Sequence, residues 1–246
     1  MALSLVSFKN VLAQDDAEIW FSQANAAYNA TAYDSALMFY NRIVDAGQES
    51  AALYFNMGDA YYKMREYPMA IYCYEKSLKL DPSNEDARVN LEIANAAIVD
   101  KIDPVPQSFI VKGWNKLKAC FSGDRWAVAS IVAFALFLVC LFLFLRVRKM
   151  GWRKVGFFVG LIMALVVVVS VVFAAQLKRE TMVDDHAIIM SPTVTVKSSP
   201  NEASVDLFVL HEGSKVTLMD EADGWNKIKI ANGSVGWLPS ATMRAF

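Results

Sequence analysis

The sequence predicts a multi-domain membrane protein that joins all-α helical repeats, a two-helix transmembrane hairpin and a small all-β barrel at the C-terminal end. Three observations predict this architecture: an internal period of 34 residues before residue 85, two long uncharged apolar segments, and alternating apolar and polar residues after residue 185. The hydrophobic content of 55% is too high for an ordinary soluble protein.

The charges are strongly segregated along the chain, although the formal net charge is only −1. Residues 15–103 carry 7 basic and 15 acidic side chains, residues 104–179 carry 11 and 1, and residues 180–246 carry 5 and 9. The basic charge therefore adjoins apolar segments and does not mark a folded face. This pattern argues against a nucleic-acid-binding protein.

Residues 126–145 and 155–175 contain no charged side chain, and they are the predicted transmembrane helices. At about 1.5 Å per residue, each can cross a hydrocarbon core of about 30 Å. The loop between them, residues 146–154, carries five basic side chains and no acid. Such a loop is expected to remain cytoplasmic, so both termini are expected outside the cytoplasm.

The segments around these domains predict a leader, two linkers and a surface helix. Residues 1–14 resemble an incomplete signal peptide without a basic start; the alternative is a frayed leader to the first helix. Residues 104–125 begin with a proline-rich linker and continue as an amphipathic helix on the membrane surface. Residues 176–186 form the second linker.

The 34-residue period is typical of a tetratricopeptide array, in which each unit is a helix–turn–helix. The predicted domain, residues 15–103, contains repeats at 17–50 and 51–84 and a capping helix at 85–99. The apolar positions of that cap are Leu91, Ile93 and Ile98. The second repeat resembles the family most closely, with its signature positions occupied by Tyr54, Met57, Gly58, Tyr61, Ala70, Tyr74 and Pro82. Gly58 and Ala70 are expected to be small because the two helices of the repeat press together there.

The resemblance implies that protein partners bind a groove lined by the first helix of each repeat. The groove residues expected by position are Phe21, Asn25, Tyr28, Asn29, Phe55, Asp59, Tyr62 and Lys63. One subclass of the family binds a terminal carboxylate through lysines, but Phe21 and Asp86 occupy two of those positions, which argues against carboxylate capture. For the groove aromatics, packing between repeats and contact with a partner remain alternatives.

Short alternating strands with turn signals between them predict the β-barrel at residues 187–246. This segment resembles the bacterial Src-homology-3-like domains, through Val194-Thr195-Val196-Lys197, Glu212-Gly213-Ser214-Lys215-Val216, Gly224-Trp225 and Gly236-Trp237-Leu238. Such domains bind cell-wall peptides or proteins. Trp225 and Trp237 could form a ligand platform, although a position in the barrel core is favoured for both.

No motif supports a catalytic, metal or cofactor site, so we expect neither an enzyme nor a cofactor. The three cysteines fit neither a metal site nor a redox pair. His186 and His211 are expected to be solvated surface residues.

The domain order resembles the Bacteroides aerotolerance (Bat) family, in particular its repeat-bearing E member. This resemblance implies a bacterial inner membrane protein with periplasmic domains, whose partners are membrane-anchored von Willebrand-A-type proteins and a MoxR-type ATPase across the membrane. The expected function is a non-enzymatic scaffold in a stress or aerotolerance complex. The alternative is an envelope sensor that binds peptidoglycan or peptide through its β-domain.

Overall fold

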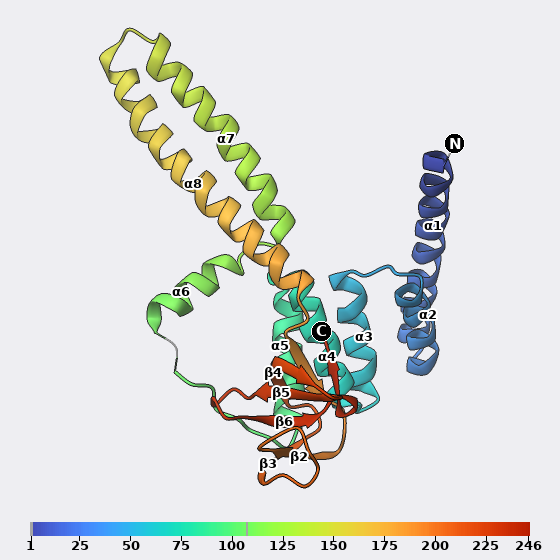
Figure 1. Cartoon of the computed structure of the whole chain (residues 1–246). Helices are drawn as coiled ribbons and strands as arrows, with labels where there is room; N and C mark the ends of the chain where they lie inside the picture. The colour runs from blue at the N-terminus through green and yellow to red at the C-terminus, as the bar shows by residue number, and fades with distance from the viewer. Residues whose placement is uncertain (1, 107) are drawn as a thin grey trace. The chain divides into compact units, whose positions relative to one another are not determined.

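A computed structural model describes residues 2–106 and 108–246, with side chains described from residue 16 onward (Figure 1). The chain divides into two compact units. The first contains the chain up to Leu80, Asn84–Pro106 and Asp184–Phe246, and the second contains Asp81–Ser83 and Gln107–Val183. The predicted signal segment, residues 1–14, lies outside the residues whose side chains are described.

The first unit begins with a row of helices: α1 (Ala2–Asn29), α2 (Tyr33–Asp45), α3 (Ala51–Lys63), α4 (Tyr67–Leu80) and α5 (Glu85–Ala97). Side-chain caps fix two of the starts, because Ser50 Oγ accepts from the Leu53 amide and Asn84 Oδ1 accepts from the Ala87 amide. The turns between paired helices repeat as well. Thr31 and Arg65, 34 positions apart, both adopt left-handed backbone, with φ of 58° and 64°.

The packing inside the second repeat confirms the prediction made for Gly58. A Cβ atom at this position would lie 2.6 Å from Cε1 of the Tyr74 ring, so only glycine lets the two helices approach this closely. Ala70 and Tyr74 are buried beside it. The prediction for Ile93 is wrong, because this side chain is 48% exposed whereas Leu91 and Ile98 pack against the helical core.

The end of the first unit is an antiparallel sheet. Its strands within the described residues are β1 (His186–Ile189), β2 (Thr193–Lys197), β3 (Asp206–His211), β4 (Lys215–Ala222), β5 (Trp225–Lys229), β6 (Val235–Pro239) and β7 (Met243–Ala245), in the order β3-β2-β6-β5-β4-β1-β7. A short 3₁₀ helix, η1 (Ser240–Thr242), leads into β7. The sheet has its own core of buried residues: Ala187, Ile189, Val194, Val196, Leu210, Val216, Ile228, Ile230 and Leu238. The sequence did not predict β7, which pairs with β1.

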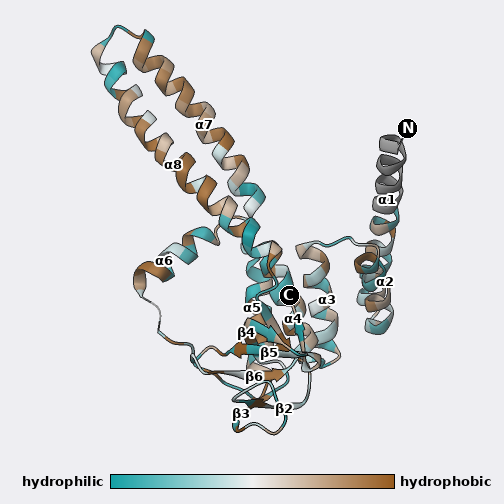
Figure 2. Cartoon of the chain, in the orientation of Figure 1, coloured by the Kyte–Doolittle hydropathy of each residue, from teal (hydrophilic) through white to brown (hydrophobic). Residues whose placement is uncertain are grey.

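The second unit contains α6 (Phe109–Lys118), α7 (Gly123–Arg146) and α8 (Met150–Met182). Among the described residues, α7 and α8 are long and apolar enough to cross a membrane, and Figure 2 shows both as mostly hydrophobic, with hydrophilic turns near their ends. They lie side by side, since a Cβ at Gly156 of α8 would be 2.9 Å from the carbonyl oxygen of Cys140 in α7. Helix α8 also continues through Met182, so residues 176–182, predicted as linker, are helical.

Aromatic side chains join the three helices of the second unit. The ring centroid of Phe173 lies 4.8 Å from that of Trp114 in α6 and 5.0 Å from that of Trp126 in α7. The indole N–H of Trp126 donates to the carbonyl of Lys118 at 3.0 Å. The amphipathic helix is thereby fixed to one end of the helical hairpin, and its apolar side chains remain exposed.

Candidate partner-binding groove and repeat-to-sheet interface

A groove crosses the first helices of the repeats and consists of two adjoining hollows. The first, with a volume of about 280 Å³, is lined by Asn25, Tyr28, Asn29, Tyr40, Asn56 and Asp59. The second, of about 180 Å³, is lined by Tyr28, Asp59, Tyr62, Lys63, Tyr74, Asn90 and Ile93. Because the hollows share Tyr28 and Asp59, we treat them as one surface, the polar groove.

Two matching hydrogen-bond motifs hold the polar groove together. In the first, Asn25 Oδ1 accepts from the Tyr40 hydroxyl at 2.6 Å and from Asn56 Nδ2 at 3.0 Å. In the second, Asp59 Oδ1 accepts from the Tyr74 hydroxyl at 2.7 Å and from Asn90 Nδ2 at 2.8 Å. The first motif joins α1 and α2 to α3, and the second joins α3 and α4 to α5.

The electrostatics of the groove centre on Asp59. Burial raises the pKa of this carboxyl, while hydrogen bonds from Tyr74 and Asn90 and the charge of Lys63 lower it in part. The pKa of Tyr40 is raised to about 12, chiefly by burial. Burial and the hydrogen bond to Asp59 likewise raise the pKa of Tyr74. The hydroxyl groups therefore stay protonated at neutral pH and act as donors to the groove side chains.

The structure places the predicted groove residues in three settings. The polar groove is lined by Asn25, Tyr28, Asn29, Asp59, Tyr62 and Lys63. Phe21 lines a third hollow, of about 560 Å³, which lies between α1, α2 and α3 and shares Asn25 with the polar groove. Its ring also contacts Tyr40, with centroids 5.9 Å apart. Phe55 packs against the ring of Tyr74, with centroids 6.2 Å apart.

The sequence reasoning missed the donors Tyr40, Asn56, Tyr74 and Asn90 as parts of the groove. The 34-residue period of the sequence contains a signal for these donors. Shifting Asn25, Tyr40 and Asn56 by 34 positions gives Asp59, Tyr74 and Asn90, so a polar triple recurs at the same spacing as the apolar signature.

A second feature, the repeat-to-sheet interface, joins α4 and α5 to the β-domain within the first unit. Ile188, Met190 and Phe246 belong to the same apolar cluster as Ile71 and Tyr72 of α4. The guanidinium of Arg244 lies 4.5 Å from the centroid of the Tyr72 ring, and the Phe246 ring meets Tyr72 edge-on at 5.9 Å. The helical core and the sheet are therefore packed together directly.

Asp100 is the polar centre of the repeat-to-sheet interface. Its carboxylate accepts from the backbone N–H of His211 at 2.7 Å, from His211 Nδ1 at 2.8 Å and from Ser214 Oγ at 2.6 Å. Burial alone would raise the pKa of Asp100, but the hydrogen bonds from Ser214 and His211 outweigh it and the pKa is lowered. Because Ser214 donates to the carboxylate and not to the imidazole, this arrangement leaves the serine unactivated.

These contacts correct the expectation that both histidines are solvated surface residues. His211 is hydrogen-bonded to Asp100, and only about a third of its side chain is exposed, at 34%. His186 is also partly covered. Its Nδ1 lies 2.6 Å from Asp185 Oδ1, and its ring centroid lies 6.0 Å from that of Phe246.

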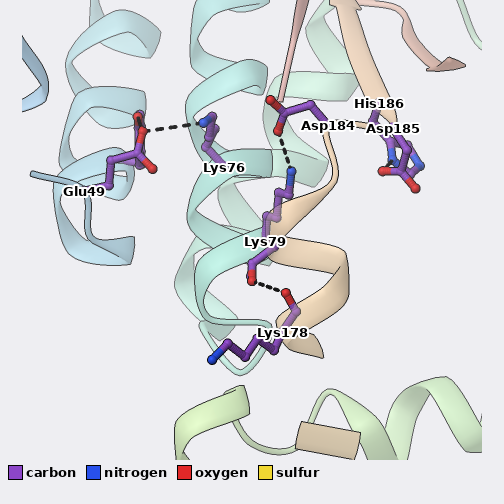
Figure 3. A network of polar contacts seen from close by, with 9 residues as sticks. Glu49, Lys76, Lys79, Lys178, Asp184, Asp185 and His186 are labelled. Atoms are coloured by element: carbon purple, nitrogen blue, oxygen red, sulfur yellow. Dashed lines mark hydrogen bonds and ion pairs between the residues drawn. The ribbon is translucent and has the colours of Figure 1, made fainter. Parts of the chain in front are cut away.

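Ion pairs add to the same region of the first unit. Lys215 Nζ lies 2.7 Å from Glu75 Oε2, which joins the start of β4 to α4. Figure 3 shows Lys79 of α4 reaching Asp184, at 2.8 Å, and Lys76 of α4 facing Glu49 of the loop between α2 and α3, at 3.6 Å. The hydrogen bond from Lys79 lowers the pKa of Asp184. A close backbone approach completes the interface, since Gly213, with φ of 85°, would place a Cβ 2.5 Å from Ile98 Cγ2.

Trp225 and Trp237 are half-buried and lie outside the buried core of the sheet. Lys227 pairs with Trp237 and Trp225 with Pro239, so alternation places both tryptophans on the face opposite Ile228 and Leu238. Lys227 Nζ lies 6.0 Å from the centroid of the Trp237 ring. The two tryptophans therefore share one face of the sheet with Lys227, whose ammonium group lies over the Trp237 ring.

Comparison with known families identifies residues 51–84 as a tetratricopeptide repeat. A search of curated proteins finds no match. Tetratricopeptide repeats are interaction modules that generally bind protein partners and are typically non-catalytic. Among the side chains that the structure describes, no three His, Cys, Asp or Glu residues are grouped so that they could hold a metal ion.

Proposed function

We propose that this chain is a membrane-anchored, non-enzymatic scaffold that binds an extended segment of a protein partner in the polar groove. The observation that carries the proposal is the pair of hydrogen-bond motifs at Asn25 and Asp59. Each holds a polar side chain of the groove lining in place before any partner arrives. Such pre-organisation lowers the entropy cost of binding.

Membrane anchoring through α7 and α8 is supported by their composition and exposure. Both helices expose large apolar side chains along most of their length, which is unfavourable in water and favourable in lipid. Arg146, Arg148, Lys149, Arg153 and Lys154 gather at the junction of the two helices, which supports a cytoplasmic junction. The repeats and the β-domain would then be periplasmic in a bacterial inner membrane.

Two features support placing the repeats and the β-domain on the same side of the membrane. An even number of spans separates them in the sequence, and the repeat-to-sheet interface lies within one compact unit. On the family resemblance, we propose von Willebrand-A-type membrane proteins of a Bat-type complex as the partners. The sheet would be a Src-homology-3-like barrel docked on the repeats.

The test compares two arginine substitutions on the exposed surface of α1. Asn29 lines the polar groove, whereas Gln23 is exposed and lies outside the residues that line it. Tagged full-length protein is purified from mildly solubilised membranes after crosslinking. We expect the same specific partner with the wild type and Gln23→Arg, and its loss with Asn29→Arg. Equal recovery by both variants would contradict a groove-bound partner.

A second candidate function is a cell-envelope sensor that binds peptidoglycan or a peptide through the β-domain. The observation in its favour is the face that carries Trp225, Lys227 and Trp237. Aromatic and cationic groups on one face suit a sugar or peptide ligand. Sedimentation of the full-length protein with purified murein tests this candidate, since Trp237→Ala should then abolish retention.

A further inference from the structure

The two hydrogen-bond motifs of the polar groove have the same geometry and differ in one charge. Asn25 and Asp59 occupy equivalent positions, and each receives a tyrosine hydroxyl and an asparagine amide on its Oδ1 atom. The tyrosines, Tyr40 and Tyr74, are also equivalent positions of the two repeats. The two sites therefore differ in the other terminal atom of the side chain, which is Nδ2 in Asn25 and Oδ2 in Asp59.

At the first site the second atom is an amide nitrogen, which can only donate, and at the second site it is a carboxylate oxygen, which can only accept. Among the described residues, both side-chain hydrogen bonds to Asp59 end on Oδ1, and Oδ2 receives none. Asp59 lines both hollows of the groove. A half-buried carboxylate oxygen that lines a groove and receives no donor favours a ligand that brings its own positive donor.

Two charged side chains act on Asp59 from its surroundings, one of each sign. Lys63 lies one turn further along α3, in the same hollow, and Asp86 contributes an opposing negative charge from the first turn of α5. The aromatic rings of Tyr28 and Tyr62 line the same hollow. An aliphatic stem with a terminal cation fits this mixture of rings and carboxylate.

We propose that the polar groove selects an extended peptide segment with a lysine or arginine side chain, which donates to Asp59 Oδ2. The neighbouring Asn25 Nδ2 then donates to a neutral acceptor such as a peptide carbonyl. This inference rests on the proposed function, because it assumes that the groove binds a peptide segment. It adds the chemistry by which the partner is recognised.

The preference for a cation also follows from the energetics of the site. Burial disfavours the charged form of Asp59, and the two donors on Oδ1 together with Lys63 offset this only in part, since the pKa stays raised. A bound ammonium or guanidinium group supplies the missing compensation. An acidic peptide would instead place like charges together in a partly desolvated groove.

The experiment uses the full-length protein in detergent micelles and four fluorescein-labelled nonapeptide libraries. In each library the central residue is fixed as lysine, arginine, glutamate or norleucine, and the other positions are degenerate. Fluorescence polarisation measures the binding of each library. We expect about tenfold tighter binding of the lysine and arginine libraries than of the norleucine library, as for a partly exposed charged hydrogen bond.

Two variants show whether any preference arises at Asp59. Asp59→Asn reproduces the arrangement at Asn25 and keeps an oxygen for Tyr74 and Asn90, so the protein should fold and lose the basic preference. Asp86→Asn removes the same charge from an exposed position of α5 outside the groove lining, and it should keep the preference. Thermal melting of each variant confirms folding.

The outcomes separate the inference from the proposed function. Equal binding of all four libraries, with loss of binding in Asn29→Arg, overturns the basic preference and leaves a peptide-binding groove. The basic preference at Asp59 is also overturned if Asp59→Asn and Asp86→Asn lose the preference equally, since the net charge of the protein would then explain the preference. If the wild type binds none of the libraries, or if Asn29→Arg binds as the wild type does, the proposed groove function is overturned as well.

Discussion

The substitution Asp100→Ala tests whether the repeats and the sheet form one packed unit. Among the described residues, the Asp100 carboxylate accepts hydrogen bonds from the His211 amide, the His211 imidazole and Ser214. Its side chain is only 14% exposed. Ser214 is only 3% exposed, so its hydroxyl would lose its partner in a position that water reaches poorly.

The magnitude follows from the hydrogen bonds that are lost. At about 1 kcal/mol for each of the three, the interface weakens by about 3 kcal/mol, or roughly 150-fold in its opening equilibrium. Hydrogen–deuterium exchange of the full-length protein in micelles measures this opening at the turn between β3 and β4. The amides of that turn should exchange roughly 150-fold faster in the variant, in proportion to the opening equilibrium.

Asp103→Asn is the control, because Asp103 is exposed and lies three positions after Asp100 in the segment that follows α5. It should leave exchange of the β3–β4 turn at the wild-type rate. If Asp100→Ala also leaves exchange there unchanged, the contacts at Asp100 do not hold the sheet on the repeats, and the account of this interface is wrong.

Four further predictions follow. Gly58→Ala should destabilise the repeats by about 1–3 kcal/mol in thermal or urea melting, because the new methyl group would overlap Tyr74; an unchanged melting temperature would contradict the packing described. The lowered pKa of Asp100 means that its contribution to stability is present above its unfolded pKa of about 3.9 and is lost as pH falls through the lower folded value. Exchange at the β3–β4 turn should therefore accelerate only below about pH 4, and Asp100→Ala should remove that acid-induced change. Asp59→Asn should leave the melting temperature at neutral pH unchanged or raised, because the raised pKa of Asp59 shows that its charged form is disfavoured in the fold; a lowered melting temperature would mean that the charge stabilises the repeats. A cysteine introduced at Ser199 should react with a membrane-impermeant probe once the outer membrane is permeable; reaction only after the inner membrane is broken would show the inverted topology.

Local sequence patterns predicted the helical repeats and the two apolar helices. Gly58 and Tyr74 could be predicted because the requirement for a small residue opposite a large one recurs with the repeat itself. The apolar runs of α7 and α8 are long and uncharged, so composition alone indicates them. Composition does not define where these helices end, since α8 continues through polar residues to Met182.

The repeat-to-sheet interface could not be predicted in the same way. Asp100 and His211 are 111 positions apart, and no local period or motif relates them. Strand β7 is short, and its alternation is too brief to stand out from the turn before it. The helical spacing predicts Ile93 as an apolar position of the capping helix beside Leu91 and Ile98, but α5 turns this side chain toward the polar groove.

The candidate site was predictable in its position and not in its chemistry. Aligning the first helices of the repeats brings Asn25 and Asp59 to the groove. The donors that orient them, such as Tyr74 and Asn90, come from the neighbouring helices. Only the spatial arrangement shows that Oδ1 of each groove side chain is occupied and that the second atom is the one left for a ligand.

The most direct test of the central claim is site-specific photocrosslinking in intact cells. A benzoylphenylalanine introduced at Asn29 would lie at the polar groove, and the same residue at Gln23 would lie outside the groove lining on the same helix. The account predicts a discrete crosslinked partner from position 29 and none from position 23. The same crosslinked products from both positions, or none from position 29, would contradict a partner-binding groove.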